Sequence, residues 1–241
     1  MAPRIAWRVA TVRAVVDETA HARSLVFEVP DWPGHRAGQH VDVRLTAEDG
    51  YQAERSYSVA SAPEDPDVVL TVERIDDGEV SPYLTEEVRA GDQLELRGPI
   101  GGHFTWRADQ GGPLLLVGGG SGLVPLMAML RHHAAQGSDA DARLLLSAGR
   151  AEDVLYHDEL GRLEGAAVHI TLTRGAPPGW TGWTRRVDAE MLRAVGPEPS
   201  AGPRAFVCGP TPFVEAVADH LLALGHAPAA IHTERFGPTG G

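Results

Sequence analysis

The sequence predicts two successive folds: a six-stranded antiparallel Greek-key barrel, followed by an α/β domain built on a parallel sheet. Up to about residue 108, short β-rich runs alternate with turn-formers such as the Asp-Trp-Pro-Gly segment at 31–34, as in a small barrel. Beyond that point, short apolar runs alternate with helical patterns, which is typical of a helix-covered parallel sheet. The change falls in the loop 108–112, so we expect domains at 1–108 and 109–241.

The barrel half contains one expected helix, 82–89. Ser81 is expected to be its N-cap, with Pro82 at the first helical position, because Ser favours N-caps and Pro favours the first turn. The barrel strands are expected at 5–16, 24–29, 40–45, 55–59, 68–72 and 93–97. In the second half we expect strands at 114–117, 144–147, 168–172 and 205–208, with a helix at 123–136 after the first of them.

Composition narrows the classes of function. The net charge of -12, from 33 acidic against 21 basic residues, argues against nucleic acid or an anionic membrane surface as the main partner. The apolar stretch 113–130 is interrupted by glycines, a serine and a proline, so we do not expect a membrane span. The N-terminus lacks the apolar core of a signal peptide, and we expect a cytoplasmic protein.

Metal and disulfide chemistry find little support in the sequence. Cys208 is the single cysteine, so this sequence forms no internal disulfide and cannot supply the thiolates of an iron–sulfur cluster. The eleven histidines show no ligand spacing, and the neighbours His132 and His133 point in different directions on a helix. We therefore expect no metal site.

The first chemical motif is Arg55-Ser56-Tyr57-Ser58 on an expected strand. Side chains two apart share a face of a strand, so Arg55 and Tyr57 point one way and the two serines the other. A bulky ring beside a guanidinium suits an aromatic group joined to a phosphate. Taken alone, the four residues also fit an ordinary strand with an exposed arginine and a packed tyrosine.

Two further motifs lie at the ends of expected parallel strands. The glycine loop Gly118–Pro125 joins an apolar run to a helix, so its backbone amides can approach a pyrophosphate. Cys208-Gly209-Pro210 ends another strand, where ligands bind in open parallel sheets. Taken alone, the loop is also explained by packing, and Cys208 by a buried, inert thiol.

Together these motifs resemble the ferredoxin–NADP⁺ reductase superfamily. In that family an Arg-x-Tyr-Ser/Thr strand, a Gly-x-x-Ser/Thr segment and a Gly-Pro-x-Gly turn precede the nucleotide domain, and here they match residues 55–58, 78–81 and 98–101. The resemblance covers essentially the whole chain. It implies an FAD-binding domain at 1–108, an NAD(P)-binding domain at 109–241, and hydride transfer from NADPH or NADH to FAD, with FMN as the less favoured flavin.

The resemblance also implies roles for individual residues. Arg55 would contact the flavin diphosphate, Tyr57 would stack on the isoalloxazine, and Ser58 would hydrogen-bond near its N5. Cys208 would lie in the nicotinamide pocket with a positional role. The implied flavin-binding residues are Arg55, Ser56, Tyr57, Ser58, Gly78, Val80 and Ser81. The implied nicotinamide-nucleotide residues are Gly119, Gly120, Ser121, Gly122, Pro125, Cys208, Gly209 and Pro210.

The choice of nicotinamide nucleotide should depend on the segment after the second parallel strand. Ser147 and Arg150 supply a hydroxyl and a guanidinium where a 2′-phosphate could bind, whereas an acidic residue there would favour NAD. Arg174 could add charge, although solvated surface arginines explain the same residues, and Glu152 and Asp153 weaken the case. We favour NADPH over NADH.

In the resemblance, a carboxylate and an aromatic ring near the C-terminus approach the exposed face of the flavin. Glu234 and Phe236 would fill these roles, and a frayed terminus is the alternative reading. The catalytic candidates are Tyr57, Ser58, Cys208, Glu234 and Phe236. Because the sequence stops before the iron–sulfur domain of some relatives, we expect electrons to pass to a separate redox protein such as a ferredoxin or an oxygenase component.

Two other functions stay open at this point. A reductase of free flavin or of another small acceptor would turn over without a partner protein. An electron-transfer or nucleotide-sensing subunit of a larger complex would bind flavin but react poorly with nicotinamide alone.

Overall fold

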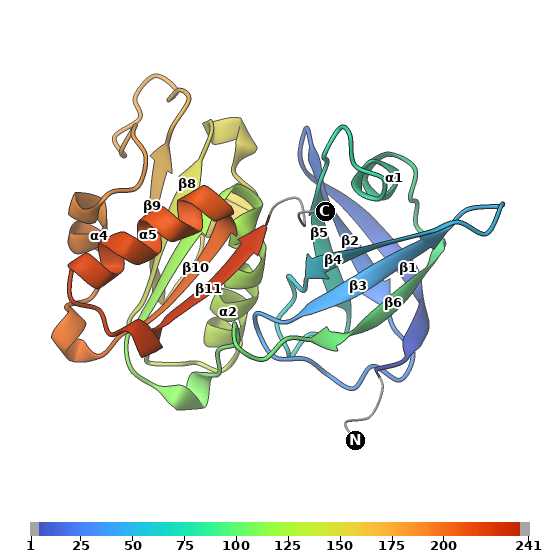
Figure 1. Ribbon diagram of the computed structural model, residues 1–241, viewed down its shortest axis with the longest axis horizontal. Coiled ribbons are helices and arrows are strands. Elements are labelled where there is room, and N and C mark those ends of the chain that lie inside the picture. Colours follow the sequence, from blue (N-terminus) through green and yellow to red (C-terminus); the bar gives the residue numbers. More distant parts are fainter. Residues whose placement is uncertain (1–4, 237–241) are drawn as a thin grey trace.

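The computed structural model describes residues 5–236 and contains an antiparallel and a parallel sheet side by side (Figure 1). The first sheet has six strands in the order β4-β3-β6-β1-β2-β5, all paired antiparallel. Its elements are β1 (Trp7–Thr19), β2 (Ala22–Glu28), β3 (His40–Thr46), β4 (Gln52–Ser58), β5 (Val68–Glu73), α1 (Ser81–Glu86) and β6 (Gln93–Ile100). The predicted six-stranded barrel is therefore confirmed.

The barrel closes because its two outer strands approach each other after β4 ends. Val59 forms an isolated antiparallel bridge to Leu70 of β5. Alternate strand residues point inward and fill the interior with apolar side chains, as the two-residue period of a strand requires. Leu25, Phe27, Val41 and Leu70 are fully buried there.

The second half is a five-stranded parallel sheet in the order β11-β10-β7-β8-β9. The order reverses between β7 and β10, and ligands bind at such a switch point in open α/β sheets. The elements are β7 (Leu114–Gly119), α2 (Leu123–Ala135), β8 (Ala142–Ala148), α3 (His157–Leu160), β9 (Ala166–Leu172), α4 (Ala189–Val195), β10 (Arg204–Pro210), α5 (Thr211–Ala223) and β11 (Ile231–Phe236).

Both faces of the parallel sheet are apolar, which explains the continuous hydrophobic runs of its strands. In β7, Leu115 and Val117 pack on the side of α4 and α5, whereas Leu114 and Leu116 pack on the side of α2. Figure 1 shows α4 and α5 in front of the sheet and α2 behind it, next to the barrel.

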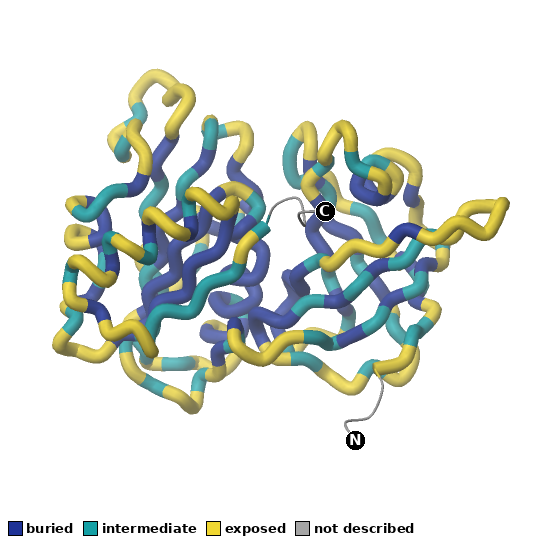
Figure 2. The backbone as a smooth tube through the Cα atoms, viewed as in Figure 1, coloured by how far each residue is buried: buried dark blue, intermediate teal, exposed yellow. Residues whose placement is uncertain are grey.

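Helix α2 is buried between the sheet and the barrel, as the dark tube at the centre of Figure 2 shows. Its core cluster includes Ala37 and Ala60 from the barrel side. A Cβ at Gly38 of the barrel would lie 2.7 Å from the Met129 methyl of α2. The Arg131 guanidinium donates to the Ala60 carbonyl at 2.7 Å. These contacts fix the two halves against each other.

The structure corrects two expectations. A fifth parallel strand, β11, extends the sheet where the sequence suggested only a tail. Helix α1 is six residues long with Val80 as N-cap, so Ser81 is its first residue and not its cap. The Ser81 hydroxyl instead accepts a hydrogen bond from the Ile75 amide at 3.0 Å, which removes it from the helix end.

Candidate active site at the domain interface

Strand β4 carries the Arg55–Ser58 motif along the outer edge of the barrel sheet. Tyr57 is half-buried against the barrel core, and burial raises the pKa of its hydroxyl. Ser56 points the other way and donates to Asp42 Oδ1 at 2.6 Å. Ser58 is 5% exposed and lies opposite His40 of β3. The strand therefore separates an aromatic ring from two hydroxyls, as its period predicts.

At the other end of the motif, Arg55 reaches the loop that precedes α1. Its guanidinium Nη2 lies 2.7 Å from Glu79 Oε2, so β4 contacts the segment 78–81. The Gly78 amide, however, already donates to the Ile75 carbonyl at 2.9 Å. A diphosphate bound by that amide would have to replace this hydrogen bond. Val80 and Ser81 are buried beside it.

The glycine loop packs tightly on the end of β10. A Cβ at Gly122 would lie 2.2 Å from the Cys208 carbonyl oxygen, and one at Gly119 would lie 2.9 Å from the Phe213 ring. Backbone atoms fill the space at Gly122, and the Phe213 side chain fills it at Gly119, so neither position has room for a Cβ. Gly120 is different: its φ is +56°, and no atom of the described residues lies within 4 Å of a Cβ built there. The loop thus has a packed inner side and an open outer side.

The remaining residues of this motif lie around the same turn. Ser121 is half-buried in the 3₁₀ turn that links β7 to α2, and Pro125 is buried in the first turn of α2. Gly209 has a φ of +154° and packs against Gly119, with a Cβ predicted at 3.1 Å from the Gly119 carbonyl oxygen. The glycine loop and the Cys-Gly-Pro segment therefore form one surface at the switch point of the sheet.

Strand β11 brings the C-terminal candidates to this surface. Glu234 pairs in register with Cys208, and Phe236 with Pro210. Glu234 also faces the barrel, where its Oε1 lies 4.0 Å from His40 Nδ1. Because His40 is the register partner of Ser58, the tail connects the nucleotide-binding half to the Arg55–Ser58 strand.

Burial controls the charge of the groups that meet here. It raises the pKa of the Glu234 carboxyl to about 7 and lowers that of the His40 imidazole. Burial, and then the Glu234 carboxylate, raise the pKa of the Cys208 thiol well above its ordinary value. Each shift favours a neutral group. The 4.0 Å approach of His40 and Glu234 is therefore a contact between two groups biased towards neutrality, although its distance alone would suggest an ion pair.

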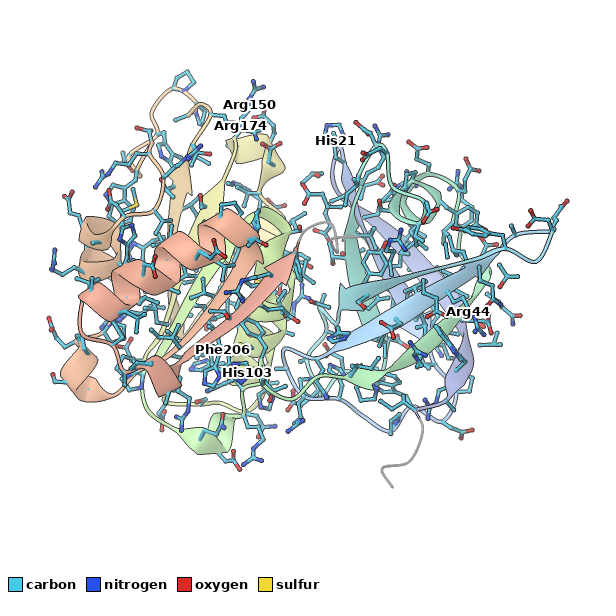
Figure 3. All side chains as sticks on the ribbon, in the orientation of Figure 1. His21, Arg44, His103, Arg150, Arg174 and Phe206 are labelled. Carbon is cyan, nitrogen blue, oxygen red and sulfur yellow. The ribbon has the colours of Figure 1, made fainter. Side chains whose placement is uncertain are left out.

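Two histidines near this site were not expected from the sequence. His232 precedes Glu234 by two residues on β11 and stacks on Phe206, with ring centroids 4.7 Å apart. His103, from the chain that links the two halves, lies 5.0 Å from the His232 ring, and Figure 3 labels it next to Phe206. Recognising 231–236 as a strand would have placed His232 and Glu234 on one face.

The residues expected to bind the 2′-phosphate of NADPH lie together at the carboxyl ends of β8 and β9. Figure 3 shows Arg150 and Arg174 close to each other at one end of the parallel sheet. The Arg174 amide donates to the Gly149 carbonyl at 2.8 Å, and Ser147 lies in β8, two residues before Gly149. Arg150 is exposed, with Glu152 at 3.6 Å. Arg185, in the segment before α4, is bound to Asp188 and Glu190.

Metal ligation and membrane insertion find no structural support in the described part of the chain. Within residues 5–236 no group of three or more His, Cys, Asp or Glu side chains is placed to hold a metal ion. No helix of that range is long and apolar enough to cross a membrane.

Both halves present groups that suit a phosphate. Arg55 is half exposed at one end, and the open side of Gly120 offers backbone to a second phosphate group. Where the two halves meet beside His40, Glu234 Oε2 is buried with no hydrogen-bond partner among the described residues. A buried carboxylate oxygen of this kind needs a partner, and a ligand between the two halves would supply one. The fold and the site define a two-domain oxidoreductase that binds a flavin and a nicotinamide nucleotide.

Comparison with known proteins identifies the family. The family model for the oxidoreductase FAD-binding domain matches residues 10–106, and that for the oxidoreductase NAD-binding domain matches residues 116–219. The chain is 34% identical over 235 residues to ferredoxin–NADP reductase B of Sorangium cellulosum, covering 93% of this chain and 91% of that protein. This chain therefore belongs to the ferredoxin–NADP⁺ reductase superfamily and carries its FAD-binding and NAD-binding domains.

Other relatives are reductase components of larger systems. The chain is 31% identical over 236 residues to the glycine betaine monooxygenase reductase subunit of Pseudomonas aeruginosa, covering 93% of this chain but 63% of that protein. It thus spans less than two thirds of the length of that relative. Among solved structures, the FAD/NAD-binding domain of nitric oxide dioxygenase from Vibrio cholerae superposes with a TM-score of 0.86 at 26% identity, covering 96% of this chain and 99% of that one.

Proposed function

We propose that this protein is an FAD-dependent NAD(P)H reductase that takes hydride from NADPH, or from NADH, and passes electrons to a separate redox protein. A ferredoxin or an oxygenase component is the kind of acceptor we expect. The names of the relatives support this reading, because the Sorangium protein is a ferredoxin–NADP reductase and the Pseudomonas protein is the reductase subunit of a monooxygenase.

One observation carries the proposal: residues of both halves converge on the same point. Glu234 lies beside Cys208 in the parallel sheet and 4.0 Å from His40, whose neighbour on the barrel is Ser58. A reaction between two cofactors needs their reacting atoms held together, and we propose that the two cofactors meet at this interface.

The chain's own residues position the reactants and control protons. When bound, FAD supplies the redox chemistry by accepting hydride and releasing electrons one at a time. We assign the Ser58 hydroxyl and the Tyr57 ring to orienting the flavin. We assign Cys208 a positional role beneath the nicotinamide pocket, because its thiol is fully buried and burial raises its pKa, which makes it a poor nucleophile.

Glu234 is the group suited to exchanging protons at this interface. Its pKa of about 7 lies near the working pH, where a carboxyl both accepts and releases protons readily. His40, at 4.0 Å from its Oε1, is half-buried and offers a route towards solvent. Phe236, the last described residue, is proposed to cover the flavin ring until nicotinamide arrives.

The finer assignments are proposals as well. We propose NADPH as the preferred donor, supported by the guanidinium groups of Arg150 and Arg174 at the ends of β8 and β9. We propose domain bounds of 1–108 and 109–241, supported by sheets that occupy 7–100 and 114–236. We propose a cytoplasmic location, where a lone thiol stays reduced.

An anaerobic visible spectrum of the purified protein tests the proposal. The protein should be yellow, or become so when incubated with FAD, and NADPH should bleach it faster than NADH in a parallel sample. Bleaching by NADH alone would leave the reductase function standing and overturn the NADPH assignment.

Two other outcomes would change the function. A protein that stays colourless after incubation with FAD contradicts the flavin site. A yellow protein that neither nucleotide bleaches contradicts the reductase and favours an electron-transfer subunit. Rapid turnover of added free flavin, with no transfer to ferredoxin or oxygenase proteins, would favour a free-flavin reductase.

A further inference from the structure

Arg55, the residue proposed to bind the flavin diphosphate, is already engaged by an acidic side chain. Its Nη2 lies 2.7 Å from Glu79 Oε2, and its Nη1 donates to the Glu54 carbonyl at 2.7 Å. Both ends of the guanidinium fork thus meet oxygen atoms of the protein. A diphosphate that binds this fork must displace at least the carboxylate.

Glu79 is held in place from its other side. The Tyr51 hydroxyl, on the β3–β4 hairpin, donates to Glu79 Oε1 at 2.9 Å, and this hydrogen bond raises the pKa of Tyr51. One carboxylate therefore bridges a phenol and a guanidinium, with one oxygen for each. Such a bridge fixes the carboxylate over Arg55 more firmly than a single contact would.

The ion pair is open to solvent. The side chains of Arg55 and Glu79 are each 50% exposed, so a phosphate group approaching from solution reaches the guanidinium without unfolding anything. Exposed ion pairs are weak, which means that Glu79 can yield to a ligand with more charge. Its carboxylate presents the same type of oxygen acceptors that a phosphate presents to an arginine.

The loop around Glu79 carries two further carboxylates. Asp76 and Asp77 lie in the same loop, and Asp76 is neutralised by Arg74 at 2.8 Å. Arg74 also pairs with Glu86 of α1, so its charge is shared between two carboxylates. Glu79 is thus the carboxylate of this loop that is paired with Arg55.

We propose that Glu79 sets the affinity for FAD by competing with the flavin diphosphate for Arg55. The inference rests on the proposed function, because it takes Arg55 as the diphosphate ligand. The Glu79 carboxylate pairs with the Arg55 guanidinium in the flavin-free protein and separates from it when the diphosphate binds. The cost of that exchange weakens FAD binding, and the carboxylate left near the diphosphate weakens it further.

Glu79→Gln tests the proposal. Glutamine keeps the length of the side chain and its oxygen acceptor but loses the charge. A like charge a few ångströms from a phosphate at a protein surface costs roughly a factor of ten in affinity, so the variant should bind FAD about tenfold more tightly. The measurement is a titration of flavin-free full-length protein with FAD, followed by the change in flavin fluorescence.

Asp77→Asn is the matched control. It removes a negative charge from the same loop at an exposed residue that does not touch Arg55, and its FAD affinity should stay within about twofold of the unaltered protein. Raising the salt concentration from about 0.05 M to about 0.5 M should shrink the advantage of Glu79→Gln, because salt screens exposed charges. Arg55→Ala, in parallel, should bind FAD at least tenfold more weakly.

The outcomes separate the inference from the function on which it rests. If Arg55→Ala loses affinity while Glu79→Gln binds FAD no better than the unaltered protein, competition is wrong and the flavin site stands. If Asp77→Asn gains as much FAD affinity as Glu79→Gln, the total negative charge of the loop sets the affinity, and the proposal of specific competition by Glu79 is wrong. If the unaltered protein binds no FAD, the proposed function itself is wrong.

Discussion

Replacing Glu234 by glutamine should remove a pH-dependent loss of stability. In the folded protein, burial raises the pKa of this carboxyl from 4.5 to about 7, whereas the unfolded chain has the ordinary value. Between these two values the folded state keeps a proton that the unfolded chain has released. Since the folded state then binds more protons, the free energy of unfolding falls as the pH rises.

The structure gives the size of this effect. The Glu234 side chain is 22% exposed, so solvent screens it only in part. Each pKa unit corresponds to about 1.4 kcal/mol, and a rise from 4.5 to about 7 therefore amounts to about 3 kcal/mol. The stabilisation is complete below about pH 4.5 and is lost once the pH passes 7. Glutamine is neutral throughout and avoids the loss.

Urea unfolding of the flavin-free protein at pH 5 and pH 8 measures this loss in the free energy of unfolding. The free energy of unfolding of Glu234→Gln, minus that of the unaltered protein, should be about 2–3 kcal/mol larger at pH 8 than at pH 5. The control is Glu215→Gln, an exposed glutamate of α5, whose curve should follow the unaltered protein. Parallel pH dependence of the Glu234 variant and the unaltered protein would refute the assignment of a raised pKa.

Three other substitutions test other parts of the molecule. Arg150→Ala should raise the KM for NADPH about tenfold in steady-state assays and leave that for NADH unchanged; equal effects on both would contradict a 2′-phosphate contact. Gly122→Ala places a Cβ 2.2 Å from the Cys208 carbonyl oxygen and should cost about 3 kcal/mol, seen as a lower Tm; an unchanged Tm would mean that the loop is not packed as described. Tyr156→Phe removes a buried hydrogen bond to Thr71 across the domain interface and should cost about 1–2 kcal/mol by urea unfolding; an unchanged free energy of unfolding would contradict this contribution.

The barrel was predictable from the sequence because its strands alternate and its turns carry Gly and Pro. All six strands lie within a few residues of their expected positions, and β3 begins at His40 as predicted. The four apolar strands of the parallel sheet were predictable for another reason: both of their faces are covered, so they read as short continuous hydrophobic runs.

The fifth parallel strand could not be recognised in this way. The residues His232, Thr233, Glu234 and Arg235 are polar, since β11 is an edge strand with partly exposed side chains. Only its pairing with β10 makes it a strand, and that pairing is a tertiary contact. The position of Glu234 beside His40 depends on it, so the sequence named Glu234 only through the family resemblance.

Predictions from local sequence patterns were also wrong where a side chain makes a tertiary contact instead. Ser81 followed by Pro82 is a good N-cap pattern, but its hydroxyl accepts from the Ile75 amide, and the helix starts one residue earlier. In the same way, the motif Arg55–Ser58 indicates a phosphate ligand without revealing that Glu79 already binds the arginine.

The burial of α2 between the two halves has a consequence for recombination between relatives. A crossover at residue 108 preserves the chain, yet it separates Arg131 from the Ala60 carbonyl and Met129 from the space beside Gly38. A chimera would take the barrel side of this contact from one parent and helix α2 from the other. The loop around residue 60 and helix α2 lie in different domains but pack against each other. In a chimera they should therefore come from the same parent.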